Sequence, residues 1–261
     1  MNLDLKGKNA LVCGSTGGIG LASALELALL GANVTLLARN EDKLNQTLPS
    51  LSKHGTQSHR ILVGDLSVPE KLSSVLGESV RTGRYHILIN NTGGPTPGTA
   101  LESSVQDFES AFKSHLGSAQ TLTQMVAPFM KEANYGRIIN VISTSVKIPI
   151  AGLGVSNTIR GAMASWAKTL SLELGPFGIT VNNVLPGSTM TPRLMQVIKS
   201  RAEKNQKTVE EVKHEMMMEV PAKRISEPQE VAAMIAFLAS PAAGYVNGTS
   251  IPVDGGRTGS I

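Results

Sequence analysis

A glycine-rich turn near the N-terminus has the composition of a phosphate-binding loop. The apolar run at residues 9–13 precedes it, is too short for a helix, and is typical of a buried strand in a parallel sheet. Apolar residues at helical spacing follow it. Such a turn lets backbone N–H groups approach a pyrophosphate, and the helix N-terminus adds partial positive charge. We therefore predict a nucleotide site, the alternative being glycines that only form a tight turn. The candidate residues are Gly14, Ser15, Thr16, Gly18, Ile19 and Gly20.

The residue after the second predicted strand bears on the choice of cofactor. This strand, residues 33–38, is followed by Arg39. A carboxylate at this place would accept the ribose 2′-hydroxyl of NAD, whereas a cation accommodates the 2′-phosphate of NADP. Arg39 therefore predicts NADP, with Ser15 or Lys43 as possible further phosphate contacts. The alternative is that Arg39 is a solvated surface cation.

Strands and helices alternate along the whole chain, which predicts a fold class. The pattern indicates an α/β, doubly wound Rossmann-type fold, with a seven-stranded parallel sheet and helices on both faces. We expect a single domain, 1–261, in which the methionine-containing segment 188–222 is a helical substrate lid; ordinary packing or an oligomer contact is the alternative for its methionines. The strands are expected at 9–13, 33–38, 59–63, 85–90, 136–142, 179–185 and within 245–254, and helices at 41–51, 108–131, 155–174 and 227–239.

Composition excludes several classes of protein. Of the 261 residues, 41% are hydrophobic and 17% charged, which is typical of a globular domain and argues against disorder. Aromatic residues make up only 3%, and the net charge of +4 comes without a dense Lys/Arg run, so we expect no nucleic-acid partner. A single cysteine permits no internal disulfide, which together with the absence of a predicted signal peptide favours a cytoplasmic protein. No apolar run reaches about 18 residues, so no membrane span is expected.

The spacing of the glycines resembles that of one enzyme family. Gly14, Gly18 and Gly20 follow the pattern Gly-x-x-x-Gly-x-Gly of the short-chain dehydrogenase/reductase family, with Cys13 where that family usually has Thr. Residues 91–94 read Asn-Thr-Gly-Gly, close to the family's Asn-Asn-Ala-Gly. Pro-Gly at 186–187 after the sixth strand is also family-like. These motifs agree in order and spacing over nearly the whole chain.

The resemblance implies roles for residues that follow several strands. Asp65, with Leu66 beside it, lies at the carboxyl end of the third strand, where ligands of doubly wound sheets bind. The family's Asp at this place binds the adenine edge, although Asp65 could instead only cap the next helix. The resemblance further implies contacts with the cofactor's ribose and nicotinamide carboxamide. The residues concerned are Asn91, Gly93, Pro186, Gly187 and Thr191.

The catalytic residues of the family match this chain only in part. The family uses a Ser, a Tyr, a Lys four residues after the Tyr, and an Asn on the preceding long helix. Ser143 matches the Ser. Counting back from the Ser-Leu-Glu-Leu at 171–174 puts Arg160 at the Lys and Ser156 at the Tyr, thirteen residues after Ser143. The preceding long helix puts His115 at the Asn.

These substitutions change the chemistry that we expect. A serine hydroxyl is a much weaker acid than a phenol of pKa about 10. Arg160 stays protonated, but it can present N–H donors to a ribose, an alkoxide or an anionic substrate. The remaining proton donors are His115, Lys147 and water; a histidine of ordinary pKa suits a general acid. The alternatives are a His115 hydrogen-bonded to backbone and a solvated Lys147. No tyrosine lies near this helix by sequence position.

The sequence therefore predicts an NADP(H)-dependent oxidoreductase that resembles 3-oxoacyl-[acyl-carrier-protein] reductases and has an altered catalytic site. Its partner would be a small-molecule carbonyl or alcohol substrate. The competing interpretation is a non-catalytic nucleotide-binding or scaffold protein. We identify no candidate metal ligands. The two long helices carry more apolar length than one sheet face needs, so a homotetramer or dimer is expected.

Overall fold

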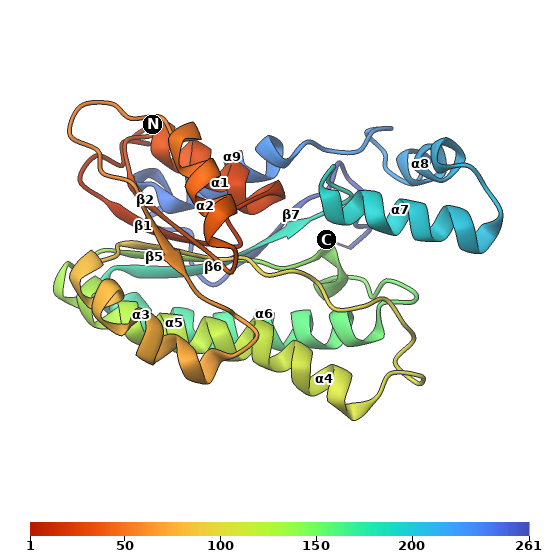
Figure 1. Ribbon diagram of the computed structural model, residues 1–261, viewed down its shortest axis with the longest axis horizontal. Coiled ribbons are helices and arrows are strands. Elements are labelled where there is room, and N and C mark those ends of the chain that lie inside the picture. The colour runs from red at the N-terminus through yellow and green to blue at the C-terminus, as the bar shows by residue number, and fades with distance from the viewer. Residues whose placement is uncertain (261) are drawn as a thin grey trace.

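A single parallel sheet organises the molecule, for which the computed structural model describes residues 1–260 (Figure 1). Its strand order is β3-β2-β1-β4-β5-β6-β7 and every pairing is parallel, which confirms the predicted doubly wound fold. The strands are β1 Asn9–Cys13, β2 Asn33–Ala38, β3 Arg60–Val63, β4 Ile87–Asn90, β5 Gly136–Val141, β6 Ile179–Pro186 and β7 Ser250–Val253.

Helices cover both faces of the sheet. In Figure 1, α1, α2 and α9 lie above it and α3, α5 and α6 lie below it. The helices are α1 Gly18–Leu29, α2 Glu41–Thr47, α3 Pro69–Gly83, α4 Val105–Phe112, α5 Ser118–Glu132, α6 Gly154–Leu174, α7 Pro192–Asn205, α8 Val209–Met218 and α9 Pro228–Ala239. Among residues 1–260, no helix is long and apolar enough to cross a membrane.

The apolar runs of the strands are explained by this double cover. Alternate side chains of a strand point to opposite faces. In β1, Ala10 and Val12 belong to the core beneath α1 and α9, whereas Leu11 and Cys13 belong to the core beneath α3 and α5. Both faces are dry, so the strand reads as a continuous apolar run without polar alternation.

A ladder of buried amide side chains crosses the sheet near its carboxyl edge. Asn90 Nδ2 donates to Asn140 Oδ1 at 2.9 Å, and Asn140 Nδ2 donates to Asn183 Oδ1 at 2.9 Å. Asn183 Nδ2 then donates to Ser250 Oγ at 3.0 Å. These residues are register partners on β4, β5, β6 and β7. The ladder therefore connects β4, β5 and β6 with the beginning of β7.

Two predicted helices are interrupted. The helix expected at 108–131 consists of α4, a π-helical turn at Lys113–Gly117, and α5. A π turn holds one more residue than an α turn and is often found at functional sites; this one contains His115. The helix expected at 41–51 ends at Thr47, because Pro49 has no N–H to continue it, and a short 3₁₀ turn follows.

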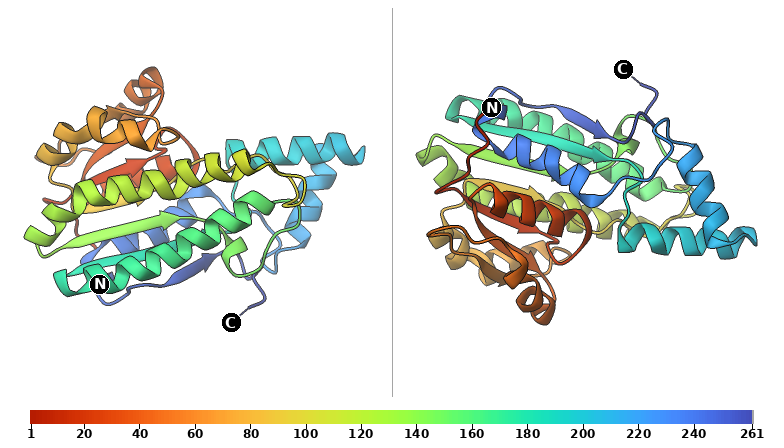
Figure 2. Two further views of the ribbon diagram at one scale, coloured as in Figure 1. Left: turned by 90° about the horizontal axis from the view of Figure 1, so that it is seen from below. Right: turned by 90° about the horizontal axis from the view of Figure 1, so that it is seen from above.

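The segment predicted as a lid forms two helices beyond the carboxyl edge of the sheet. Figure 2 shows α7 and α8 projecting past the sheet in both views. Thr191 caps α7 by accepting a hydrogen bond from Leu194 N at 3.2 Å. Thr208 and Glu211 form the capping box of α8. These capping side chains explain why this polar segment forms helices although it does not pack on the sheet.

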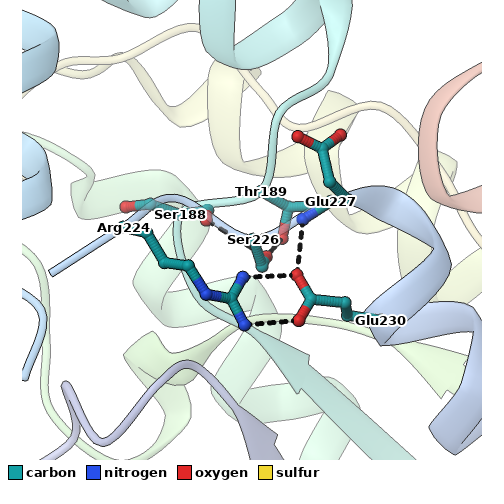
Figure 3. A network of polar contacts seen from close by, with 6 residues as sticks. All are labelled: Ser188, Thr189, Arg224, Ser226, Glu227 and Glu230. Carbon is teal, nitrogen blue, oxygen red and sulfur yellow. Dashed lines mark hydrogen bonds and ion pairs between the residues drawn. The ribbon is translucent and has the colours of Figure 1, made fainter. Parts of the chain in front are cut away.

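A polar network ties together the two stems of this segment (Figure 3). The Ser226 N–H donates to Ser188 O at 2.9 Å, and Ser226 Oγ donates to Thr189 Oγ1 at 3.0 Å. Beside them, Arg224 donates to both carboxylate oxygens of Glu230 at 2.5 and 2.6 Å. The same carboxylate accepts from the N–H of residue 227 at 2.8 Å. The two ends of the segment 188–222 are therefore held next to each other by these hydrogen bonds.

Candidate functional site

The glycine-rich turn is shaped by contacts that only glycine permits. Gly14 has φ +59°, and a Cβ at Gly20 would lie 2.2 Å from Gly14 O. Asn91 Nδ2 donates to Cys13 O at 3.3 Å and to Gly14 O at 3.4 Å. The predicted Asn91 therefore holds the turn at the end of β1 as well as lying at its own strand end.

The N-terminus of α1 is open to an anion. Its cap residue is Gly17, which offers no side-chain hydrogen bond, and the first turn carries no acidic residue. The N–H groups and the helix dipole there suit a phosphate. The side chain of Ile19 is partly buried against the core, and its backbone N–H is the group at this position that suits a phosphate. Thr191 lies over this turn, since its Cγ2 is 3.1 Å from where a Cβ at Gly18 would stand.

A cavity of about 460 Å³, here called cavity A, opens beside the turn. It combines the turn with the carboxyl ends of β2, β3 and β4, as expected for a doubly wound sheet. Seven of the predicted cofactor residues line it, together with Lys43, Ser67, Thr92 and Gly94. These seven are Gly14, Thr16, Arg39, Asp65, Leu66, Asn91 and Gly93.

Cavity A carries its positive charge where the sequence predicts it. Arg39 and Lys43 line its rim, and both are exposed. The expectation that the Ser15 hydroxyl assists them is wrong, because that side chain is fully buried and donates to Leu37 O at 3.3 Å. The Ser15 side chain turns inward because both its hydroxyl and its backbone N–H donate to the Leu37 carbonyl of the neighbouring strand. Arg39 and Lys43 are thus the remaining candidates to bind a 2′-phosphate.

The alternative role of Asp65 as a helix cap is wrong. Helix α3 begins at Pro69 and its cap residue is Val68. The Asp65 carboxylate instead accepts from Ser67 N at 2.9 Å and Ser67 Oγ at 2.8 Å. Desolvation opposes ionisation, but these hydrogen bonds and the charge of Arg39 together hold the pKa of Asp65 below its ordinary value. Asp65 is therefore an ionised acceptor on the wall of cavity A.

A second cavity of about 530 Å³, cavity B, lies under α7. Ser143, Ser156, Pro186 and Gly187 line it, all of them predicted site residues. Ser143 follows β5, and its Oγ accepts from Ser145 N at 3.1 Å. That bond uses a lone pair, so the Ser143 hydroxyl proton is free to be donated to a ligand in cavity B.

Arg160 lies beneath cavity B and does not line it. It is 7% exposed, its Nη1 donates to Val141 O at 2.9 Å, and its buried Nε has no partner. Among the described residues no carboxylate pairs with it. Burial lowers the pKa of Arg160 to about 10, so the side chain remains a cation at neutral pH. A buried cation without a counter-charge is costly and typical of a functional site.

The expectation that His115 is a general acid of ordinary pKa is wrong for this environment. His115 is 2% exposed, its Nδ1 contacts Thr92 Oγ1, and its Nε2 is buried without a partner. Burial and the nearby charge of Arg160 lower the pKa of His115 to about 3. The imidazole is therefore neutral at physiological pH. The alternative of a side chain bonded to backbone is not observed either, since its partner is the Thr92 hydroxyl.

The buried His115 predicts a specific acid sensitivity. Because its pKa falls from about 6.5 to about 3 on folding, the unfolded chain binds a proton that the folded chain does not. The stabilising effect is present above pH 6.5 and is lost as the pH falls toward 3. Between pH 7 and pH 5, we expect the free energy of unfolding to fall by about 2 kcal/mol less in His115→Asn than in the parent. Urea unfolding at both pH values measures this; parallel losses in the two proteins would contradict it.

No tyrosine lines either cavity among residues 1–260. Tyr85 is buried and donates to Thr35 Oγ1 at 3.0 Å, Tyr135 donates to Ala239 O at 2.9 Å, and Tyr245 is fully exposed. The candidate proton donor Lys147 is exposed and does not line cavity B. These positions agree with the prediction that no tyrosine lies near the start of α6.

Sequence reasoning missed two sets of site residues. Thr92 was noted only as a substitution within the motif at 91–94, yet it joins cavity A to His115. The second set belongs to the segment 188–222, of which only the methionines were considered in the sequence, whereas Arg193 and Arg201 line cavity B. The i, i+8 spacing of these arginines on one helix was the available signal.

Comparison with known proteins identifies the family. The chain belongs to the short-chain dehydrogenase/reductase family: the family model described as enoyl-(acyl carrier protein) reductase matches residues 14–258. The chain is 31% identical over 256 residues to the NADPH-dependent reductase BacG of Bacillus subtilis, a match that covers 97% of this chain and 99% of that one.

Solved structures show the same fold with bound cofactor. The L-sorbose reductase of Gluconobacter frateurii, complexed with NADPH and L-sorbose, matches with a TM-score of 0.93 and 30% identity over 100% of both chains. A putative NAD(P)-dependent gluconate 5-dehydrogenase of Beutenbergia cavernae, with bound NADP, matches with a TM-score of 0.89 and 28% identity over 100% of both chains. The cofactor of these relatives agrees with the NADP predicted from Arg39.

Proposed function

We propose that this protein is an NADP(H)-dependent oxidoreductase that interconverts a small carbonyl compound and its alcohol. Family membership supports oxidoreductase chemistry. The observation that carries the proposal is the juxtaposition of two cavities, one with a glycine turn and Arg39, the other with a serine hydroxyl free to donate. The 3-oxoacyl compounds of the original resemblance are one class of substrate to be tested.

The residues present fit a dinucleotide. The glycine turn and open α1 N-terminus suit the pyrophosphate, Arg39 and Lys43 suit the 2′-phosphate, and Asp65 suits the adenine. Pro186 and Gly187 then stand at the nicotinamide end, on the wall of cavity B. When bound, the reduced nicotinamide supplies the hydride.

In this proposal each of the four residues at the catalytic positions has a separate role. Ser143 donates a hydrogen bond to the carbonyl oxygen, where negative charge develops as hydride is added to the carbon. Arg160 stabilises that charge, or a ribose hydroxyl, as a fixed cation beneath the cavity. His115 is a neutral positioning residue that holds Thr92, and Ser156 orients water in cavity B. Water then delivers the proton to the oxygen.

The direct test is NADPH oxidation by the purified protein with a panel of simple ketones, sugar ketones and 3-oxoacyl thioesters. Turnover of at least one acceptor, measured by loss of absorbance and by chromatography of the alcohol, is the expected result. Cofactor binding is measured separately by fluorescence titration.

A second candidate is a nucleotide-binding protein without catalysis. It is favoured by one observation, that among residues 1–260 no tyrosine or histidine lines cavity B with Ser143. Protein that binds NADPH and oxidises none of it, but gains activity in the double variant Ser156→Tyr with Arg160→Lys, would establish this alternative.

Cofactor preference follows from Arg39. We expect NADPH to bind more tightly than NADH, because the guanidinium can pair with the 2′-phosphate in a charge-assisted contact. Arg39→Asp is expected to narrow or reverse the preference, with Lys43 limiting the change. Lys53→Asp, an exposed change outside cavity A, is the control. Equal affinity of the parent for both cofactors by fluorescence titration would contradict the assignment.

We also propose self-association through the long helices. Val105 and Phe112 on α4 and Leu172 on α6 are exposed apolar side chains, and symmetric interfaces bury such surfaces. We expect light scattering to show a dimer or tetramer at micromolar concentration, and Phe112→Glu to weaken it. A monomer of 27.5 kDa would exclude this assembly. A cytoplasmic location, and closure of the segment 188–222 over substrate, are further parts of the proposal.

A further inference from the structure

One face of α7 concentrates positive charge in cavity B. The residues of α7 that line the cavity recur at helical spacing, and three of them are basic: Arg193, Arg201 and Lys204. The remaining basic residue of this helix, Lys199, and its acidic residue, Glu203, do not line the cavity. Three of the four basic residues of α7 therefore line the cavity, whereas its one acidic residue does not.

Two of these cations have no protein partner within residues 1–260. Arg193 donates to Pro95 O at 2.9 Å, so it is used in attaching α7 to the loop after β4. Arg201 and Lys204 make no ion pair or side-chain hydrogen bond. Arg257, which also lines the cavity, is paired with Glu219 at 2.5 Å.

The carboxylates near this face are engaged with other partners. Glu215 and Glu219 line a neighbouring hollow with Arg201 and Lys204, and Glu215 pairs with Lys207. Glu102 is the acidic residue that lines cavity B, and it accepts a hydrogen bond from Thr99 Oγ1 at 2.7 Å, on the loop opposite α7. Glu219 is held by Arg257. Arg201 is partly buried, where a charge interacts more strongly with an anion than it does in open solvent.

Part of the remaining wall is apolar. The serines and the basic residues share the cavity with aliphatic side chains and a methionine, which suit a short carbon chain. These residues are Ile150, Leu153, Leu194, Val197 and Met216. A volume of about 530 Å³ is within the range of sites for small organic ligands.

We propose that cavity B takes a carbonyl compound that carries a carboxylate at the far end of an aliphatic chain, and that Arg201 is the residue that binds this carboxylate, with Lys204 beside it. The proposal rests on the proposed function for the carbonyl chemistry. The guanidinium fork matches the two oxygens of a carboxylate, while the carbonyl reaches Ser143.

The first experiment measures NADPH-dependent reduction of levulinate and of its neutral methyl ester, then of unbranched keto acids of increasing chain length. We expect the acid to have the lower KM, with an optimum chain length. Arg201→Gln is expected to raise KM for the acid roughly 10- to 100-fold, since a hydrogen bond to a charged group is lost, and to leave the ester unchanged. Lys199→Gln, on the same helix but outside the cavity, is the matched control.

The second experiment needs no turnover. Pentanoate, pentanamide and propylphosphonate are titrated by calorimetry into the NADPH complex of the parent and of Arg201→Gln. Binding of pentanoate but not pentanamide, lost in Arg201→Gln, supports the proposal even where the parent reduces nothing, in which case only the proposed function fails. Reduction of ester and acid with equal KM, an Arg201→Gln variant that treats them as the parent does, or binding of the phosphonate alone would overturn it.

Discussion

Replacement of Ser143 by alanine is expected to lower kcat for carbonyl reduction by about 100- to 1,000-fold, the usual cost of removing one preorganised donor to a developing oxyanion. The structure gives the reason. Ser143 Oγ already accepts from Ser145 N at 3.1 Å, so its own proton has no competing acceptor and its orientation is fixed. The donor therefore needs no reorganisation when charge develops on the substrate oxygen.

The matched control is Ser200→Ala, which removes another hydroxyl from the wall of cavity B, on α7. It should leave kcat close to that of the parent. Affinity of Ser143→Ala for NADPH, by fluorescence, should also be retained, because the glycine turn and Arg39, which are proposed to bind the phosphates, line cavity A and Ser143 does not. A parent that turns over while Ser143→Ala loses nothing would place the reacting carbonyl elsewhere. Thermal unfolding is measured alongside, since the alanine also loses the cap of a short 3₁₀ turn.

Replacement of Arg160 by methionine is expected to retain the stability of the protein and to lower its activity. A pKa lowered from 12.5 to about 10 corresponds to roughly 3 kcal/mol of unfavourable charge burial, because each tenfold change in an acid constant is about 1.4 kcal/mol. The penalty is fully present at neutral pH, where the side chain is charged in both states, and is relieved only as the pH rises above 10. Methionine is shorter than arginine and uncharged, and its flexible apolar side chain can fill part of the vacated space.

We therefore expect Arg160→Met to unfold at equal or higher denaturant concentration than the parent, although Val141 O loses its donor. Activity is expected to fall by at least about 100-fold, as for the loss of an electrostatic contact in a water-excluded site. Arg137→Met provides the comparison. Arg137 is also buried, but it donates to carbonyls of residues 136, 178 and 240, so its loss should destabilise. A destabilised Arg160→Met with full activity would show that the arginine is structural.

The sequence by itself determined the architecture, and it predicted seven of the residues that line cavity A, the proposed nucleotide site. The turn at 14–20, the strands around it and the position of Arg39 were predictable because their signals are local. Glycine spacing reports on backbone conformation, and an apolar run with helical or strand period reports on which face is buried. Ser143 was predictable in the same way, because it directly follows the apolar run of a strand. Cavity A accordingly contains seven of the predicted residues.

Only the tertiary structure decided the state of the side chains at the site. The neutral His115 depends on burial beneath Thr92 and on the charge of Arg160, which lies 45 residues away along the chain. Arg160 itself could be placed on α6 from its spacing, but its unpartnered Nε could not. The inward orientation of the Ser15 side chain and the orientation of the basic residues of α7 could not be predicted from the sequence either. Desolvation and electrostatic interaction depend on what packs around a group in three dimensions, and no local pattern carries that information.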